Sequence, residues 1–307
     1  MAHVHGGPAT GRYLGWSIIL TLAFVAGEAV AGYASNSLAL LSDAGHNFAD
    51  ALALILSWYA VRVGRWPADA RRTFGYHRVG VLVALANAVS LVVIALLIFW
   101  EAVQRFRSPE PVQSGWMIGV AAGAIVLNAL ITVWLRGEAK HDLNIRSAYL
   151  HMLGDALSAA GVVAAGVLIA LTGRVVFDPA VSLLIGGFIL WSSWGILSES
   201  VNVLLEAVPK GLDVDEVVQA IRRVPGVRDV HHLHVWTISP GMPACSCHVI
   251  VGEQSARDGQ RVQQSAAELL REQFHIAHTT IQVEVDGCDA GAADCAMRPL
   301  ADHDHHE

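Results

Sequence analysis

Two long stretches of this chain contain no charged residue, and they constrain its fold more than any other feature does. They cover residues 79–100 and 111–135, and each is longer than the roughly 20 residues that cross the hydrocarbon core of a bilayer. A backbone in lipid has to satisfy its own hydrogen bonds, which favours helices over loops and open sheets. The two stretches therefore predict membrane-spanning helices.

Four further apolar segments extend this pattern, although some of them carry isolated ionisable residues. Of all residues in the chain, 54% are hydrophobic and only 15% are charged, against roughly 25% charged in an ordinary soluble domain. The lipid bilayer is thus the main environment that we predict for this chain. The six predicted spans cover approximately residues 13–33, 38–63, 79–100, 111–135, 148–171 and 181–203.

The net charge of −7 lies entirely in the last third of the chain. Residues 1–207 hold 12 acidic and 12 basic side chains, whereas residues 208–307 hold 15 acidic and 8 basic ones. This asymmetry predicts a membrane domain followed by an acidic domain in water. No basic stripe exists outside one short loop, so we expect no nucleic-acid partner. All four cysteines lie in the acidic part without a Cys-x-x-Cys spacing, which predicts reduced thiols in the cytoplasm.

Lysine and arginine are unevenly distributed between the loops on the two sides of the predicted membrane. Nine lie in the N-terminal tail and in the loops after the second and fourth spans, and three lie in the loops on the opposite side. Because cytoplasmic loops carry the excess of positive charge, both termini are predicted to face the cytoplasm across the inner (cytoplasmic) membrane. With six spans, the second and fifth helices run antiparallel.

These two spans carry matching pairs of histidine and aspartate. His46 and Asp50 lie in the second span, and His151 and Asp155 lie in the fifth. Residues four apart share one face of a helix, so two such helices facing each other offer four ligands to a tetrahedral metal ion. Each residue alone could be a satisfied polar group of the bundle. The duplication favours an ion-binding site instead, since ionisable groups inside a membrane mark ion or proton paths.

The type of ligand narrows the choice of metal. Imidazole together with carboxylate in a tetrahedral set favours Zn²⁺, with Cd²⁺ and Co²⁺ as companions. Protons compete with the metal for these ligands, and free imidazole, with a pKa of about 6.5, is the most easily recharged. We therefore expect the site to load metal from the cytoplasm and to release it outward as protons bind.

The acidic part predicts a small two-layer α/β domain with the order α-β-β-α-β. Asp213 is a predicted N-cap with Glu216 three residues on, and Pro240-Gly241 predicts a hairpin turn. We expect domains at residues 1–12 (an N-terminal tail), 13–206 (six spans), 207–288 (the α/β domain) and 289–307 (a polar tail with histidines). The predicted elements of the α/β domain cover approximately residues 213–223, 227–239, 244–251, 255–274 and 279–285.

Four motifs in this chain resemble those of the cation diffusion facilitator family, the zinc-type metal exporters. They are SNSLALLSDA at 35–44, DLN at 142–144, HVWTI at 234–238 and TIQVE at 280–284. The resemblance implies an all-α six-helix transmembrane bundle followed by a cytoplasmic, ferredoxin-like or metallochaperone-like αββαβ domain. It also implies a homodimer that exchanges metal for protons, with His46, Asp50, His151 and Asp155 as the transport site.

The same resemblance implies a second metal site in the cytoplasmic domain. Its ligands at matching positions are His231, His248 and Glu284, with His278 as a further ligand. Strand alternation predicts that His232 lies on the opposite face from His231 and His248.

A third site, in the loop between the second and third spans, is implied by relatives that bind metal through an Asp and two His. This chain keeps Asp69, but Arg72 and Tyr76 stand where those histidines would fall, and His77 lies one position away. Asp69 and His77 are therefore the candidate ligands there.

Three further features of the sequence give weaker indications of function. Glu28, inside the first span, is interpreted either as a proton relay or as the partner of another polar group in the bundle. Arg78 and Glu206 are predicted to form a salt bridge where the membrane meets the cytoplasm. The terminal histidines are interpreted either as a metal-collecting fringe or as polar tails.

Two other functions remain open from the sequence. An intramembrane metal-dependent enzyme fits poorly, because the chain has no His-Glu-x-x-His and no general base beside either His/Asp pair. A membrane protein that senses metal without transporting it would have the same four ligands.

Overall fold

The structure is a computed structural model that describes the backbone of residues 8–135 and 143–285 and the side chains of residues 22–133, 149 and 152–285. The predicted C-terminal tail, together with Cys288 and Cys295, lies outside the described residues. The chain divides into two compact units. One forms within residues 1–65 and 82–199, and the other within residues 66–81 and 200–307.

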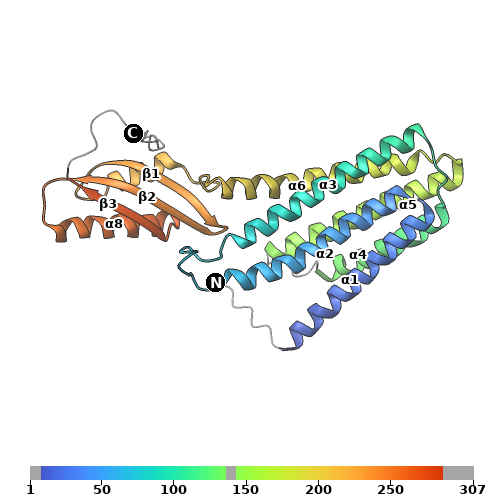
Figure 1. Ribbon diagram of the computed structural model, residues 1–307, viewed down its shortest axis with the longest axis horizontal. Helices are drawn as coiled ribbons and strands as arrows, with labels where there is room; N and C mark the ends of the chain where they lie inside the picture. Colours follow the sequence, from blue (N-terminus) through green and yellow to red (C-terminus); the bar gives the residue numbers. More distant parts are fainter. Residues whose placement is uncertain (1–7, 136–142, 286–307) are drawn as a thin grey trace, which may run out of the picture. The chain divides into compact units, whose positions relative to one another are not determined.

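Six long helices precede the first strand in the described part of the chain (Figure 1). The first begins inside the predicted N-terminal tail. Helix α1 packs against α2 and α4, α4 packs against α5, and α5 also contacts α2. The helices are α1 (Pro8–Ser35), α2 (Leu38–Gly64), α3 (Val79–Arg107), α4 (Ser114–Leu135), α5 (Leu143–Thr172) and α6 (Phe177–Leu204).

Four stretches of the described residues are long and apolar enough to cross a membrane, and they belong to α3, α4, α5 and α6. Helix α2 is not among them, and its first half carries Asp43, His46 and Asp50. In α1, the apolar stretch of the described side chains is shorter, Leu22–Ser35. The chain is therefore a helical membrane protein with four clearly apolar spans, and the count of six stays a prediction.

Two glycines let helices of the bundle approach each other closely. A Cβ on Gly166 of α5 would lie 2.7 Å from the Cγ1 atom of Ile118 in α4, and one on Gly186 of α6 would lie 2.7 Å from the ring of Phe99 in α3. Small residues at such crossings are typical of membrane helices, because close backbone approach maximises packing where lipid supplies no hydrophobic driving force. A continuous apolar core joins the helices, with Leu40, Ile189 and Met117 fully buried.

The second unit contains the predicted order α-β-β-α-β. Asp213 caps the first helix, and its side chain accepts a hydrogen bond from the backbone N–H of Asp215. Ser239 pairs with Met242 across a two-residue turn, so the second strand begins two residues before its predicted start. The elements are α7 (Val214–Arg222), β1 (Val227–Ser239), β2 (Met242–Val251), α8 (Ala256–Phe274) and β3 (His278–Glu284).

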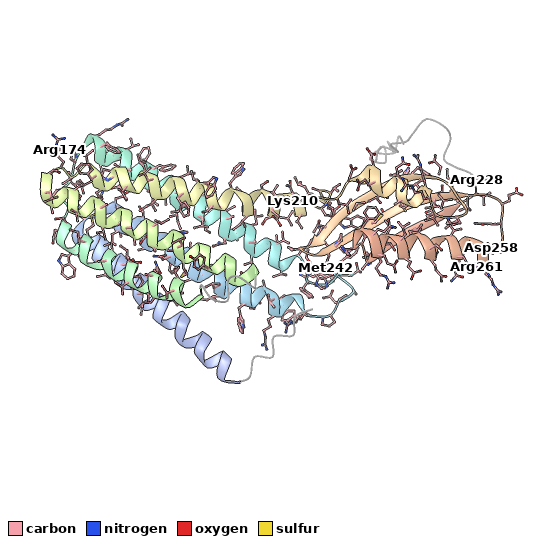
Figure 2. All side chains as sticks on the ribbon, turned by 180° about the vertical axis from the view of Figure 1, so that it is seen from behind. Arg174, Lys210, Arg228, Met242, Asp258 and Arg261 are labelled. Atoms are coloured by element: carbon pink, nitrogen blue, oxygen red, sulfur yellow. The ribbon has the colours of Figure 1, made fainter. Side chains whose placement is uncertain are left out.

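The three strands form one sheet in the order β1-β2-β3. Strands β1 and β2 are antiparallel, and β2 and β3 are parallel, which requires the crossover that α8 provides. Figure 1 shows α8 lying along the sheet, and Figure 2 shows Asp258 and Arg261 together on α8, where they form an ion pair of 3.0 Å.

One face of the sheet packs against α7 and α8 and is apolar. Cys245 and Cys247 are buried in this core and form no disulfide. The polar side chains of the sheet remain on its other face.

Candidate metal centre

Helices α2 and α5 bring three of the four predicted intramembrane ligands together. His46, Asp50 and Asp155 each offer one ligand atom, and the three atoms lie within 4.8 Å of one another. The Nε2 atom of His46 is 3.4 Å from an oxygen of Asp50 and 3.5 Å from an oxygen of Asp155. Ligand atoms around a tetrahedral zinc ion, at about 2.0–2.1 Å from the metal, lie about 3.3–3.4 Å apart. The spacing therefore suits a small divalent cation.

The fourth predicted ligand, His151, has a side chain outside the described residues. Its backbone belongs to α5, one helical turn before Asp155. Its place among the ligands therefore stays a prediction.

A hydrogen bond one turn away holds the two helices in this relation. Ser158 of α5 donates to Asp43 of α2 over 2.6 Å, and Asp43 is almost fully buried. Asp43 precedes His46 by three residues, whereas Ser158 follows Asp155 by three. The two contacts thus occur in opposite order along the chain, which makes α2 and α5 antiparallel, as predicted. Sequence analysis missed Ser158, although its i, i+3 spacing from Asp155 was a usable signal.

The start of α2 is anchored by a second residue that sequence analysis missed. Asp178, at the beginning of α6, is fully buried and accepts hydrogen bonds from the Ser37 hydroxyl (2.6 Å) and from the backbone N–H groups of Leu38 and Ala39 (2.8 and 3.2 Å). The guanidinium of Arg105 lies 3.4 Å from the same carboxylate. Asp178 therefore caps the helix that carries His46. Because it lies far from α2 in the sequence, no local sequence motif predicts this cap.

A second cluster forms on the sheet of the other unit, from His231, His248 and Glu284. His231 Nε2 and His248 Nδ1 lie 2.9 and 2.8 Å from the two carboxylate oxygens of Glu284. Partial burial tends to raise the pKa of Glu284, but the hydrogen bond from His231 and the nearby imidazoles outweigh it, so this pKa is lowered. Glu284 is therefore ionised and available as a ligand.

His232 joins this cluster, against the expectation from strand alternation. The β1–β2 register shifts between His231 and His234, and His232 adopts a left-handed φ of 51°. This bulge turns its ring onto that of His248, with centroids 4.8 Å apart. Desolvation, together with the neighbouring histidines, lowers the pKa of His232. The prediction was wrong here because a bulge adds one residue and reverses the alternation.

His278 lies apart from the cluster. It pairs with Ala244 at the start of β3, whereas Glu284 pairs with Ile250 near the end of the same strand. At about 3.3 Å per residue, the six residue steps from His278 to Glu284 span about 20 Å. The ring of His278 contacts Phe74 instead, so the prediction of His278 as a ligand of this set is corrected.

In the loop after α2, the carboxylate of Asp69 is occupied by the loop itself. One oxygen accepts from the backbone N–H groups of Arg71 and Arg72, and the other accepts from the Tyr76 hydroxyl. The Tyr76 hydrogen bond is the main reason why the pKa of Asp69 is lowered. His77 lines a cavity with Phe74 instead. Among the described residues, Asp69 and His77 do not meet in a metal-binding group.

The predicted pairing of Arg78 with Glu206 is present, with 3.0 Å between the guanidinium and the carboxylate. Both side chains are exposed, so the pair contributes about 0–1 kcal/mol.

Both units match models of known protein families. Residues 15–205 match the cation efflux transmembrane domain, and residues 209–286 match the cytoplasmic domain of cation efflux proteins. The chain belongs to the cation efflux family. Members of this family are transporters and not enzymes, which excludes the intramembrane enzyme considered above.

Characterised relatives are similar over nearly the whole chain. The zinc transporter ZitB of Escherichia coli (strain K12) is 38% identical over 100% of this chain and 99% of its own length. A cadmium, cobalt and zinc/H(+)-K(+) antiporter of Bacillus subtilis (strain 168) is 33% identical over the full length of both chains. The metal-bound C-terminal domain of the CzcD transporter from Cupriavidus metallidurans, a solved structure, covers 24% of this chain at 31% identity with a TM-score of 0.23.

Proposed function

We propose that this protein exports Zn²⁺ from the cytoplasm and that His46, Asp50, His151 and Asp155 bind the ion during transport. The convergence of three of these ligands within 4.8 Å, inside the helical bundle of a cation efflux protein, carries the proposal. Relatives named for zinc, cadmium and cobalt transport support Zn²⁺ as substrate, with Cd²⁺ and Co²⁺ accepted as well.

The proposed topology has six spans between residues 13 and 206, with residues 207–288 and both termini in the cytoplasm. The excess of lysine and arginine in the loops of one side supports this orientation. The transport domain lies in the inner membrane, and the cytoplasmic domain brings two copies together as a homodimer. The match to the cation efflux cytoplasmic domain supports the homodimer.

The proposed mechanism is exchange of metal for protons. With its ligands deprotonated, the site accepts Zn²⁺ from the cytoplasm, and protons from the other side displace the ion from the same ligands. His46 shares the metal with two carboxylates, which supply negative charge to offset the double positive charge of the ion. The cytoplasmic ligands His231, His248 and Glu284 hold a further Zn²⁺ that stabilises or regulates the domain.

Zinc flux into proteoliposomes tests this function. In the Asp155→Ala variant one ligand is lost, and we expect zinc flux at the level of empty liposomes. Asp215→Ala, which changes an aspartate at the start of α7, should transport like the wild type. Undiminished flux in Asp155→Ala would contradict the proposal, and zinc binding without flux in the wild type would favour a sensor.

A further inference from the structure

Glu28 of α1 is a buried acid that supplies no ligand to the proposed metal site. Its side chain is fully buried. The Oε2 atom accepts a hydrogen bond from the Asn47 amide over 3.0 Å, whereas Oε1 is buried without a hydrogen-bond partner among the described residues. One carboxyl oxygen of Glu28 therefore has a hydrogen-bond partner in the bundle, and the other has none among the described residues.

The charged groups that face Glu28 are acidic. Asp43 of α2 and Asp155 of α5 both interact with it electrostatically, and Asp43 in turn interacts with His46. Among the described residues, no lysine or arginine forms an ion pair with Glu28. A buried carboxylate with carboxylate neighbours and no cation is strongly disfavoured, and such a group is neutralised by binding a proton.

We propose that Glu28 is a proton-binding residue, separate from the metal ligands, whose proton exchanges with the transported cation. When protonated, Oε1 or Oε2 becomes a hydroxyl, and the uncharged acid no longer repels Asp43 and Asp155. This inference rests on the proposed function, and it assigns to a side chain outside the ligand set one of the protons that the exchange requires.

The coupling follows from charge. A divalent cation held by His46, Asp50 and Asp155 adds two positive charges at Asp155, which interacts electrostatically with Glu28. These charges favour the ionised form of Glu28, so metal entry expels one proton. Metal release restores the negative field, and one proton returns to Glu28. Because coupling is reciprocal, a proton on Glu28 weakens metal binding by the same factor that metal weakens proton binding, typically about 5- to 150-fold.

Counting the protons released when zinc binds tests the proposal. Titration calorimetry of the full-length protein in lipid nanodiscs, repeated in buffers of different ionisation enthalpy, gives this number. We expect Glu28→Gln, which mimics the protonated acid, to release up to one proton fewer per zinc ion than the wild type. Its zinc affinity should fall and depend less on pH. The exposed glutamate of α6 provides a matched control, since Glu199→Gln makes the same chemical change and should leave the count unaltered.

Infrared difference spectra keep the test independent of how well one variant folds. In the wild type, zinc binding should remove the carbonyl band of a protonated carboxylic acid. Glu28→Asp retains an acid and should shift this band, whereas Glu28→Gln should lack it. An equal proton count in wild type and Glu28→Gln, or a wild type without such a band, overturns the role of Glu28. Absence of zinc flux in the wild type would instead overturn the proposed function.

Discussion

The two ligand clusters of this protein use the same residue types but differ in the distances between their ligand atoms. In the bundle, His46 lies 3.4–3.5 Å from its two carboxylate neighbours, a separation longer than a good hydrogen bond. On the sheet, His231 and His248 already contact Glu284 at 2.8–2.9 Å. The intramembrane ligands are spaced for a cation, whereas on the sheet His231 and Glu284 are already joined by a hydrogen bond.

This difference has an energetic consequence. A metal that enters the cluster on the sheet has to replace the hydrogen bond between His231 and Glu284, and a hydrogen bond to a charged group is worth about 1.5–3 kcal/mol. In the bundle, α6 and α5 hold α2 in place through Asp178 and Ser158, so the ligands of α2 are positioned by contacts outside the cluster.

The largest expected effect separates the two clusters directly. Because second-layer changes around a metal already cost about 10- to 100-fold, loss of the ligand His46 in His46→Ala should lower zinc flux by more than about 100-fold. His248→Ala should leave flux within about threefold of the wild type and remove one bound zinc per chain. Flux in proteoliposomes and metal content by mass spectrometry measure both, and similar losses of flux in the two variants would contradict the comparison.

The anchoring of α2 should be the next largest contribution. Asp178→Ala leaves Arg105, with a side chain only 10% exposed, without its buried partner, and breaking such a pair costs about 3–5 kcal/mol. Thermal unfolding in detergent, followed by circular dichroism, should show a large drop in Tm. Glu101→Gln removes the exposed partner of the same arginine and should cost at most about 1 kcal/mol. Equal drops would show that the cap does not hold the helix.

The cluster on the sheet should respond to pH in two steps. The folded-state pKa of His232 is lowered, so its contribution to stability is present above about pH 6.5 and is lost as pH falls through the lowered value. The pKa of Glu284 is also lowered, so its contribution is present above about pH 4.3 and is lost at still lower pH. Calorimetric unfolding of the full-length protein across this range measures both. His232→Asn should remove only the first step; a variant that keeps both steps would exclude His232 as the source of the first.

The smallest effect is expected at the exposed pair of Arg78 and Glu206. Arg78→Glu should reduce transport less than threefold, since such pairs are worth about 0–1 kcal/mol. The double reversal Arg78→Glu with Glu206→Arg should restore part of the loss in the same flux assay. A double variant no better than the single one would indicate that the two charges act separately.

Much of the fold followed from local patterns. Apolar stretches, two of them without any charged residue, predicted the helices that contain the four clear spans, and turn residues such as Pro240 and Gly241 predicted the hairpin of the sheet. The order of elements in the second unit was correct because capping and alternation are local properties of the chain. The bulge at His232 was missed, since a single added residue changes no composition or period that a sequence pattern records.

The sequence by itself determined the kinds of ligand and their spacing, because i, i+4 pairs on a helix need no knowledge of the rest of the molecule. The tertiary structure alone decided which groups surround those pairs. Asp178 caps α2 from α6, Ser158 binds Asp43 from α5, and Glu28 lies buried among acids with one oxygen unsatisfied. These contacts join residues far apart in the chain, and burial and charge act through distance in space, which local sequence patterns do not encode.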